Sequence, residues 1–198
     1  MAEVKFEGLN FTTTVADSSL LVSSFLNELR SSLSVENTYI GRPVVGLHIE
    51  SDTYSTKDMV ATLQLCHGSR CIIIQLLHLD SIPQSLKTFL ADPEICLVGI
   101  CINDDIAKLR NDHGLECATG LDLAPLRDEV YPSPRYSLFN KPENLELARE
   151  FAAVSAPRPR NLSSSDWGAR SLTLEQIKYS SMTAKFLFMS GSLFAIEN

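Results

Sequence analysis

The segment 44–50 constrains the fold of this chain more than any other stretch. It is short, apolar and rich in β-branched residues, and it follows a Gly-Arg-Pro turn, so it predicts a buried central strand. Because side chains alternate along a strand, His48 and Glu50 share one face, and Asp52 would continue that face. A buried charge is costly unless it is paired. These groups are therefore either a structural histidine with a salt-bridged glutamate or part of a site.

Composition sets the class of protein. The 198 residues suffice for one domain with a sizeable core, and we predict a single domain over residues 1–198. Hydrophobic residues make up 44% of the chain, which indicates a globule rather than a disordered chain. The net charge is -7 and the sequence pI about 5.1, so no strongly basic nucleic-acid-binding surface is visible in the totals. Nucleic acid would have to bind a local basic patch or be held through metal ions.

The cysteines indicate a cellular compartment. There are five, without Cys-x-x-Cys spacing and mostly inside apolar runs: Cys66, Cys71, Cys96, Cys101 and Cys117. This odd number predicts reduced, buried thiols in an intracellular protein rather than a disulfide or zinc framework. The sequence has no signal-peptide pattern and no run of about 18 apolar residues, so we expect no membrane span. The expected location is the cytoplasm, with the nucleus as a second compartment.

Hydrophobic periodicity and turn residues predict strands first and then alternating strands and helices. The predicted strands cover residues 3–15, 44–50, 60–66, 71–77, 95–102 and 115–123. The predicted helices cover residues 17–33, 81–90, 106–112, 125–130, 143–151 and 171–192, and the predicted long loops are 131–142 and 156–165. A turn at Gly68-Ser69 favours an antiparallel meander of the second to fourth strands. The fold class is therefore α/β, a mixed five- to six-stranded sheet flanked by helices.

Polar groups also stand at the ends of two other elements. Asp104 and Asp105 precede the predicted helix 106–112, where carboxylates complement the helix dipole, and for Asp104 capping is the preferred interpretation. Tyr179 and Thr183 lie four residues apart and so share one face of the last helix. Taken alone, such a pair is more typical of packing than of chemistry. A capping box, Thr-x-x-Gln at 173–176, marks the start of that helix.

Together these segments resemble the DEDDy-type 3′–5′ exonuclease domain of the ribonuclease-H-like superfamily, the group of the Werner-type exonuclease and ribonuclease D. The family strand reads Gly-Φ-Asp-Φ-Glu, where Φ is apolar, and this chain has Gly-Leu-His-Ile-Glu at 46–50. The second motif, Val-Gly, an apolar stretch, Asp and then Lys-Leu, is matched by residues 98–109 around Asp105. The third, Leu-(Ser/Thr)-x-x-Gln-x-x-Tyr-Ala-Ala-x-Asp-Ala, is matched by residues 172–184, and Trp167 stands where the family often has a tryptophan.

The resemblance implies a metal-dependent nuclease site. In the family, four carboxylates hold two Mg²⁺ or Mn²⁺ ions, which activate water and stabilise the leaving oxygen, and a tyrosine orients the attacking water. In this chain Glu50 and Asp105 would be metal ligands and Tyr179 would position water. His48 and Thr183 stand in place of two family aspartates. An imidazole suits Mn²⁺ better than Mg²⁺, so His48 is a candidate metal ligand or base.

The two replaced carboxylates lower the negative charge of the site by two. A second ion would then bind weakly unless Asp52, Asp104 or a neighbouring subunit contributed a ligand. A closer resemblance is to small plant exonuclease-like proteins of similar length, including the RISC-interacting clearing 3′–5′ exoribonucleases. That group implies a ring-like homohexamer with active sites at subunit interfaces, degradation of short single-stranded RNA, and contact with Argonaute proteins.

Two functions are compatible with these motifs. The first is a metal-dependent 3′–5′ exoribonuclease, which the retained Glu50, Asp105 and Tyr179 favour. The alternative is a catalytically inactive exonuclease-fold protein that serves as an RNA-binding or assembly subunit, which His48 and Thr183 favour.

Overall fold

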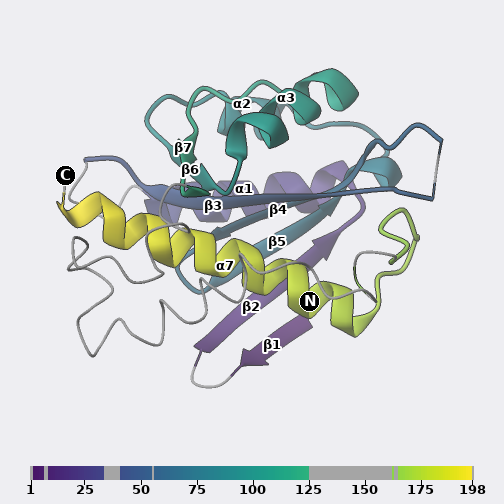
Figure 1. The fold of residues 1–198 in the computed structure, drawn as a ribbon, viewed down its shortest axis with the longest axis horizontal. Helices are drawn as coiled ribbons and strands as arrows, with labels where there is room; N and C mark the ends of the chain where they lie inside the picture. Colours follow the sequence, from purple (N-terminus) through teal and green to yellow (C-terminus); the bar gives the residue numbers. More distant parts are fainter. Residues whose placement is uncertain are drawn as a thin grey trace.

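The fold is a seven-stranded mixed sheet with helices on both faces, in the strand order β1-β2-β5-β4-β3-β6-β7 (Figure 1). The computed structural model describes residues 2–6, 9–33, 41–54, 56–124, 162 and 165–197. The strands are β1 Ala2–Phe6, β2 Leu9–Ala16, β3 Val44–Ser51, β4 Val60–His67, β5 Arg70–Gln75, β6 Cys96–Gly99 and β7 Leu121–Asp122. The helices are α1 Ser19–Leu33, the 3₁₀ turn η1 Leu76–His78, α2 Gln84–Leu90, α3 Ile102–His113 and α7 Leu174–Glu197.

The predicted α/β class and antiparallel meander are confirmed. β3 pairs antiparallel with β4, and β4 with β5, while β6 joins β3 in parallel. The sheet has more strands than the five or six expected, because the segment read as one strand at 3–15 folds into the β1–β2 hairpin. Phe6 and Leu9 are directly opposite each other in the register of that hairpin.

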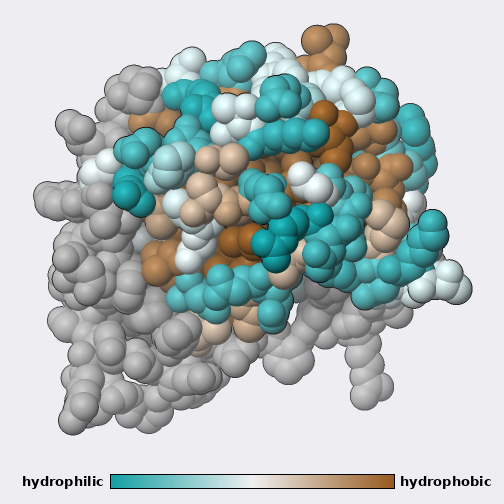
Figure 2. Space-filling view, turned by 90° about the horizontal axis from the view of Figure 1, so that it is seen from above, coloured by the Kyte–Doolittle hydropathy of each residue, from teal (hydrophilic) through white to brown (hydrophobic). Residues whose placement is uncertain are grey.

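The main core lies between one face of the sheet and helices α1, α2 and α3. Alternation along β3 sends Val45, Leu47 and Ile49 into this core, where they join apolar side chains of the three helices. Seen from the side of α2 and α3, hydrophilic side chains spread over the described surface with hydrophobic ones between them (Figure 2). The opposite face of β3 carries Gly46, His48 and Glu50, and α7 covers it.

Helix α7 lies directly on the backbone of β3. A Cβ atom at Gly46 would come within 2.1 Å of the carbonyl oxygen of Ala184, so only glycine permits this approach. Farther along the sheet, Thr13 Oγ1 bonds Ser181 Oγ at 3.0 Å, and Ser181 Oγ donates to the carbonyl of Ile177 at 2.6 Å. Small polar side chains therefore connect α7 to a sheet face that is itself polar.

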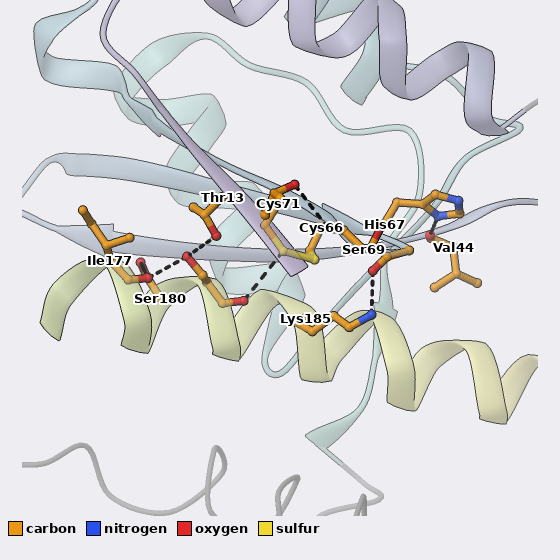
Figure 3. The surroundings of a disulfide bond; sticks show 12 residues. Thr13, Val44, Cys66, His67, Ser69, Cys71, Ile177, Ser180 and Lys185 are labelled. Atoms are coloured by element: carbon orange, nitrogen blue, oxygen red, sulfur yellow. Dashed lines mark hydrogen bonds between the residues drawn. A yellow bond between two sulfur atoms is a disulfide. The ribbon is translucent and has the colours of Figure 1, made fainter. Parts of the chain in front are cut away.

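The prediction that all five cysteines are reduced is wrong for one pair. Cys66 and Cys71 form a disulfide between β4 and β5, beneath α7 (Figure 3). The turn at Gly68 and Ser69 brings the two cysteines directly opposite each other in the strand register, with Cα atoms 4.2 Å apart. Spacing rules for cysteine motifs do not detect a pair that is aligned by hairpin register. The other three cysteines are free thiols, and burial raises the pKa of Cys117 to about 12.

The start of α3 also differs from the prediction. The helix begins at Ile102 rather than Ile106, because Cys101 adopts a left-handed conformation with φ of 54° and turns the chain directly from β6 into the helix. Asp122 supports this turn, since its Oδ1 accepts the backbone N–H of Cys101 at 2.9 Å. Asp104 and Asp105 are consequently inside the first helical turn and do not precede it.

One further predicted boundary is confirmed and another changes. The capping box of α7 is confirmed: Thr173 N–H donates to Gln176 Oε1 at 2.8 Å, and Gln176 N–H donates to Thr173 Oγ1 at 3.2 Å. The strand expected at 115–123 contracts to the two residues of β7. The helices and loops predicted between 125 and 161 lie outside the described residues. In the described part of the chain, no helix is long and apolar enough to cross a membrane.

Candidate active site

The polar end of β3 is the centre of the site. His48 and Glu50 project from the face under α7, with His48 Nε2 3.0 Å from Glu50 Oε1. The Glu50 side chain is fully buried, whereas the His48 side chain retains 18% of its exposure. On the neighbouring strand β4, Thr62 and Gln64 lie opposite these residues, and Gln64 Nε2 donates to Thr62 Oγ1 at 2.7 Å. Glu50 is thus a buried carboxylate in a polar strip of the sheet.

Asp105 joins this strip from helix α3. Burial raises the pKa of its carboxyl from 3.8 to about 7; the His48 charge opposes the rise, and Asp104, Glu50 and Asp122 add to it. These mutual effects require Asp105 to lie near both His48 and Glu50. The structure therefore brings together three of the four predicted site residues, from two elements far apart in the sequence.

Tyr179 and Thr183 come from α7, the helix that covers this face of β3. The Tyr179 ring lies 6.4 Å from the Trp167 ring, centre to centre. Thr183 Oγ1 donates to the carbonyl oxygen of Tyr179 at 2.9 Å. The hydroxyl that replaces a family carboxylate is therefore bonded within its own helix.

Asp52 and Asp104 were the two carboxylates that could have contributed a further metal ligand. Asp52 Oδ1 accepts the backbone N–H of Tyr54 at 3.0 Å and so shapes the turn after β3. Gly168 lies against the Asp52 carboxyl, since a Cβ there would be 2.8 Å from Asp52 Cγ. Asp104 is exposed in the first turn of α3, where its charge complements the helix dipole, but the N-cap residue is Cys101, whose side chain makes no capping hydrogen bond.

Hydrogen bonds from side chains that the sequence did not single out hold the segment 165–171 next to the site. His78 Nε2 lies 2.8 Å from the carbonyl oxygen of Gly168, and Gln75 Nε2 donates to the carbonyl of Ala169 at 3.1 Å. Gln176 Nε2 holds the carbonyl of Asp166 at 2.9 Å. A glutamine at the end of a buried strand is the one sequence signal that could have indicated Gln75. These bonds hold the buried Trp167 against α7.

The donor set fits one divalent cation rather than two. Glu50 is a buried carboxylate, and burial, with a smaller effect of nearby carboxylates, raises the pKa of Asp105; a cation between the two would favour their charged forms. Carboxylate oxygens suit Mg²⁺ and Mn²⁺, and an imidazole at the edge favours Mn²⁺. Among the described residues, however, no three His, Cys, Asp or Glu side chains are arranged as a ligand set.

The mixed sheet with its central strand β3, the helices on one face and the covering helix α7 on the other define a domain of the ribonuclease-H-like fold. The chain belongs to the 3′–5′ exonuclease family, because the family model described as 3′–5′ exonuclease matches residues 21–189. The predicted family is thereby confirmed.

Known relatives carry the same description. The "Exonuclease 3'-5' domain-containing protein 2" of Drosophila melanogaster is 32% identical over 127 residues, which are 63% of this chain and 20% of that protein. A "3'-5' exonuclease" of Arabidopsis thaliana is 28% identical over 163 residues, 79% of this chain and 54% of that protein. The chain thus spans from a fifth to about half of the length of these relatives.

Solved structures support the fold. The EXD2 exonuclease domain superposes with a TM-score of 0.52 at 24% identity, covering 92% of this chain and 87% of that chain. The same domain soaked in Mn gives the same TM-score, and the form soaked in Mn and Mg gives 0.51. At this level of identity the likeness establishes the fold alone.

Proposed function

We propose that this chain is a metal-dependent 3′–5′ exoribonuclease that shortens single-stranded RNA. The observation that carries the proposal is the approach of two carboxylates from separate elements: burial raises the pKa of Asp105 on α3 to about 7, and the charge of Glu50 on β3 adds to that rise. His48 Nε2 lies 3.0 Å from Glu50 Oε1, and a second carboxylate near that pair supports a cation site rather than a structural salt bridge alone.

Glu50 and Asp105 would hold one Mn²⁺ or Mg²⁺ ion. When bound, such an ion supplies charge stabilisation for a phosphodiester and a more acidic water molecule. The EXD2 exonuclease domain, which shares the fold, was crystallised with Mn and Mg soaks, and this supports the choice of metals. His48, whose Nε2 lies 3.0 Å from Glu50 Oε1, would accept a proton at the exposed edge of the site.

Tyr179 would orient the attacking water from α7. Its place is set by the close packing of α7 on Gly46 and by the Trp167 ring beside it. The sequence resemblance supports this role, because Tyr179 occupies the tyrosine position of the third motif.

The missing ligands would come from a neighbouring subunit. A homohexameric ring, expected from the resemblance to the small plant exoribonucleases, would place a second chain at the open side of each site. Closed rings form when a head-to-tail interface completes a rotation. Short RNA in complex with Argonaute proteins, in the cytoplasm or nucleus, is the substrate context that this resemblance supports.

A second candidate function is an inactive exonuclease fold that binds RNA or assembles with active subunits. Two observations favour it. Thr183 offers a hydroxyl that is already bonded to the Tyr179 carbonyl, and the His48 imidazole occupies one oxygen of Glu50. Both contacts reduce what the site can offer to a metal ion.

End-labelled RNA separates the two functions. The purified chain is incubated with 3′-labelled and 5′-labelled single-stranded RNA, and with DNA of the same sequence, in Mn²⁺, Mg²⁺ or EDTA. Stepwise shortening from the 3′ end that EDTA stops supports the exoribonuclease. Retained RNA binding without cleavage supports the inactive fold, and equal cleavage of DNA rejects the RNA preference.

A further inference from the structure

Helix α3 is fastened to the β3–β4 connection by side chains that follow Asp105. Lys108 Nζ donates to Ser51 Oγ at 2.9 Å, to the carbonyl oxygen of Asp58 at 2.6 Å and to Asp58 Oδ2 at 2.9 Å. All three donors of one ammonium group are therefore used on the segment that follows Glu50. Such a lysine connects two elements and does more than solvate a helix face.

The same stretch of α3 also holds the first residue of β4. Val60 N–H donates to Asp112 Oδ2 at 2.8 Å, and the carbonyl oxygen of Val60 lies 2.7 Å from His113 Nε2. Val60 pairs with Ser51 across a register shift located between Glu50 and Ser51. Helix α3 thus forms hydrogen bonds with both strands, β3 and β4, next to this register shift. A register shift of this kind can change the direction in which a side chain points.

The turn itself depends on Lys108. Asp58 has φ of 44°, a left-handed conformation that is unfavourable for a residue with a Cβ atom. Lys108 bonds both the carbonyl and the carboxylate of this residue. The lysine is therefore the group that ties this strained turn to α3.

We propose that Lys108 is a positioning residue that fixes the separation of Glu50 and Asp105, an inference that rests on the proposed function. Lys108 lies three residues after Asp105 and so near the same face of α3, while its partner Ser51 directly follows Glu50. The Lys108–Ser51 bond therefore lies next to both proposed metal ligands: Lys108 is on the same helix as Asp105, and Ser51 is on the same strand as Glu50. Ligands must be held within about 0.5 Å of a productive geometry to bind a metal well.

A purely structural role predicts something different. The Lys108–Asp58 ion pair is partly open to solvent, with 64% of the Asp58 side chain and 30% of the Lys108 side chain exposed, and such pairs contribute little to the free energy of unfolding. Removal of Lys108 should therefore change metal affinity and turnover much more than thermal stability. This separation is what the experiment measures.

The test compares Lys108→Met, which keeps the aliphatic stem, and Lys108→Arg, which keeps charge and donors, with Lys87→Met, an exposed lysine on α2, as the control. Mn²⁺ affinity is measured by calorimetry, turnover with labelled RNA, and thermal midpoint by circular dichroism. We expect Lys108→Met to weaken Mn²⁺ binding by about tenfold or more and to lower kcat with little change in KM. Lys108→Arg should recover part of the loss, and the control should match wild type.

The outcomes distinguish this inference from the function on which it rests. If wild type binds Mn²⁺ and Lys108→Met binds it equally well, the positioning role is rejected and the proposed function stands. A loss of affinity that only accompanies a large drop in thermal midpoint, without recovery in Lys108→Arg, also rejects positioning. If wild type binds no Mn²⁺, the proposed function fails and this inference fails with it.

Discussion

His48 Nε2 lies 3.0 Å from Glu50 Oε1, two residues along the same face of strand β3. In the family pattern an aspartate stands at the position of His48. The imidazole replaces a negative charge with a group that bonds the remaining glutamate. Because His48 and Thr183 replace two family aspartates, these positions offer two carboxylates where the family has four.

Restoring both family carboxylates tests whether the site has lost its second ion. The variant carries His48→Asp and Thr183→Asp, and it regains two anionic ligands. We expect tighter Mg²⁺ binding and an increase in 3′–5′ cleavage of tenfold or more, equivalent to about 1.4 kcal/mol of activation free energy. Calorimetry and labelled RNA measure the two effects.

The single variant His48→Asp separates a lost ligand from a working one. If His48 now serves as a ligand or base, this variant alone should be less active than wild type. Two adjacent carboxylates without a second ion would also raise each other's pKa. Higher activity in the single variant would show that His48 makes no contribution.

Asp105 should make metal-free stability depend on pH. Its pKa is raised from 3.8 to about 7, so between these values the folded state binds a proton that the unfolded state has released. The free energy of unfolding therefore falls as pH rises from about 4 to about 7, by on the order of a few kcal/mol. In EDTA, Asp105→Asn should lack this contribution and be more stable than wild type at pH 8.

Urea unfolding of both proteins at several pH values measures this effect. The difference between wild type and Asp105→Asn cancels the other carboxylates, which titrate in both. A difference that stays constant from pH 4 to pH 8 would contradict the burial of Asp105 beside Glu50.

Gly46→Ala should displace α7 from the sheet. The new Cβ would lie 2.1 Å from the Ala184 carbonyl oxygen and 2.6 Å from the Phe188 nitrogen, and backbone atoms cannot rotate away. We expect a loss of about 3 kcal/mol or more in the free energy of unfolding. Gly120→Ala is the control, because its Cβ would meet the Ile106 Cδ1 methyl group at 2.9 Å, which can move. Equal stability of the two variants would be incompatible with the packing of α7 on β3.

The Cys66–Cys71 disulfide should be visible in a thiol count. Of the five cysteines, three should react in denaturant alone and all five after reduction. Reduction should lower the free energy of unfolding by roughly 2 kcal/mol, the value for a short closed loop. A variant with Cys66→Ala and Cys71→Ala should be insensitive to reductant. Five reactive thiols in the purified protein before reduction would contradict the pairing.

The sequence patterns predicted those features that depend on residues close together in the sequence. Alternation in 44–50 predicts that His48 and Glu50 share a face, and the capping box predicts where α7 begins; both are found. The order of three motifs predicted that Asp105 would meet Glu50. For the strand and the capping box, neighbours in sequence determine the direction of each side chain, whereas the meeting of Asp105 and Glu50 was expected from the resemblance alone.

Features that depend on register or backbone twist were not predictable. The Cys66–Cys71 pair follows from the alignment of two strands, and the early start of α3 follows from the left-handed Cys101. The bonds of Lys108 to Ser51 and Asp58 join segments about fifty residues apart, and periodicity carries no information on such contacts.

The most direct test of the central claim is metal-dependent cleavage by wild type, Glu50→Gln and Asp105→Asn. Glu94→Gln, an exposed carboxylate elsewhere on the surface, is the matched control. The account predicts stepwise 3′ shortening of single-stranded RNA by wild type and Glu94→Gln in Mn²⁺, and loss of that activity in both site variants. Cleavage that survives Glu50→Gln and Asp105→Asn would contradict the claim and place the chemistry elsewhere in the chain.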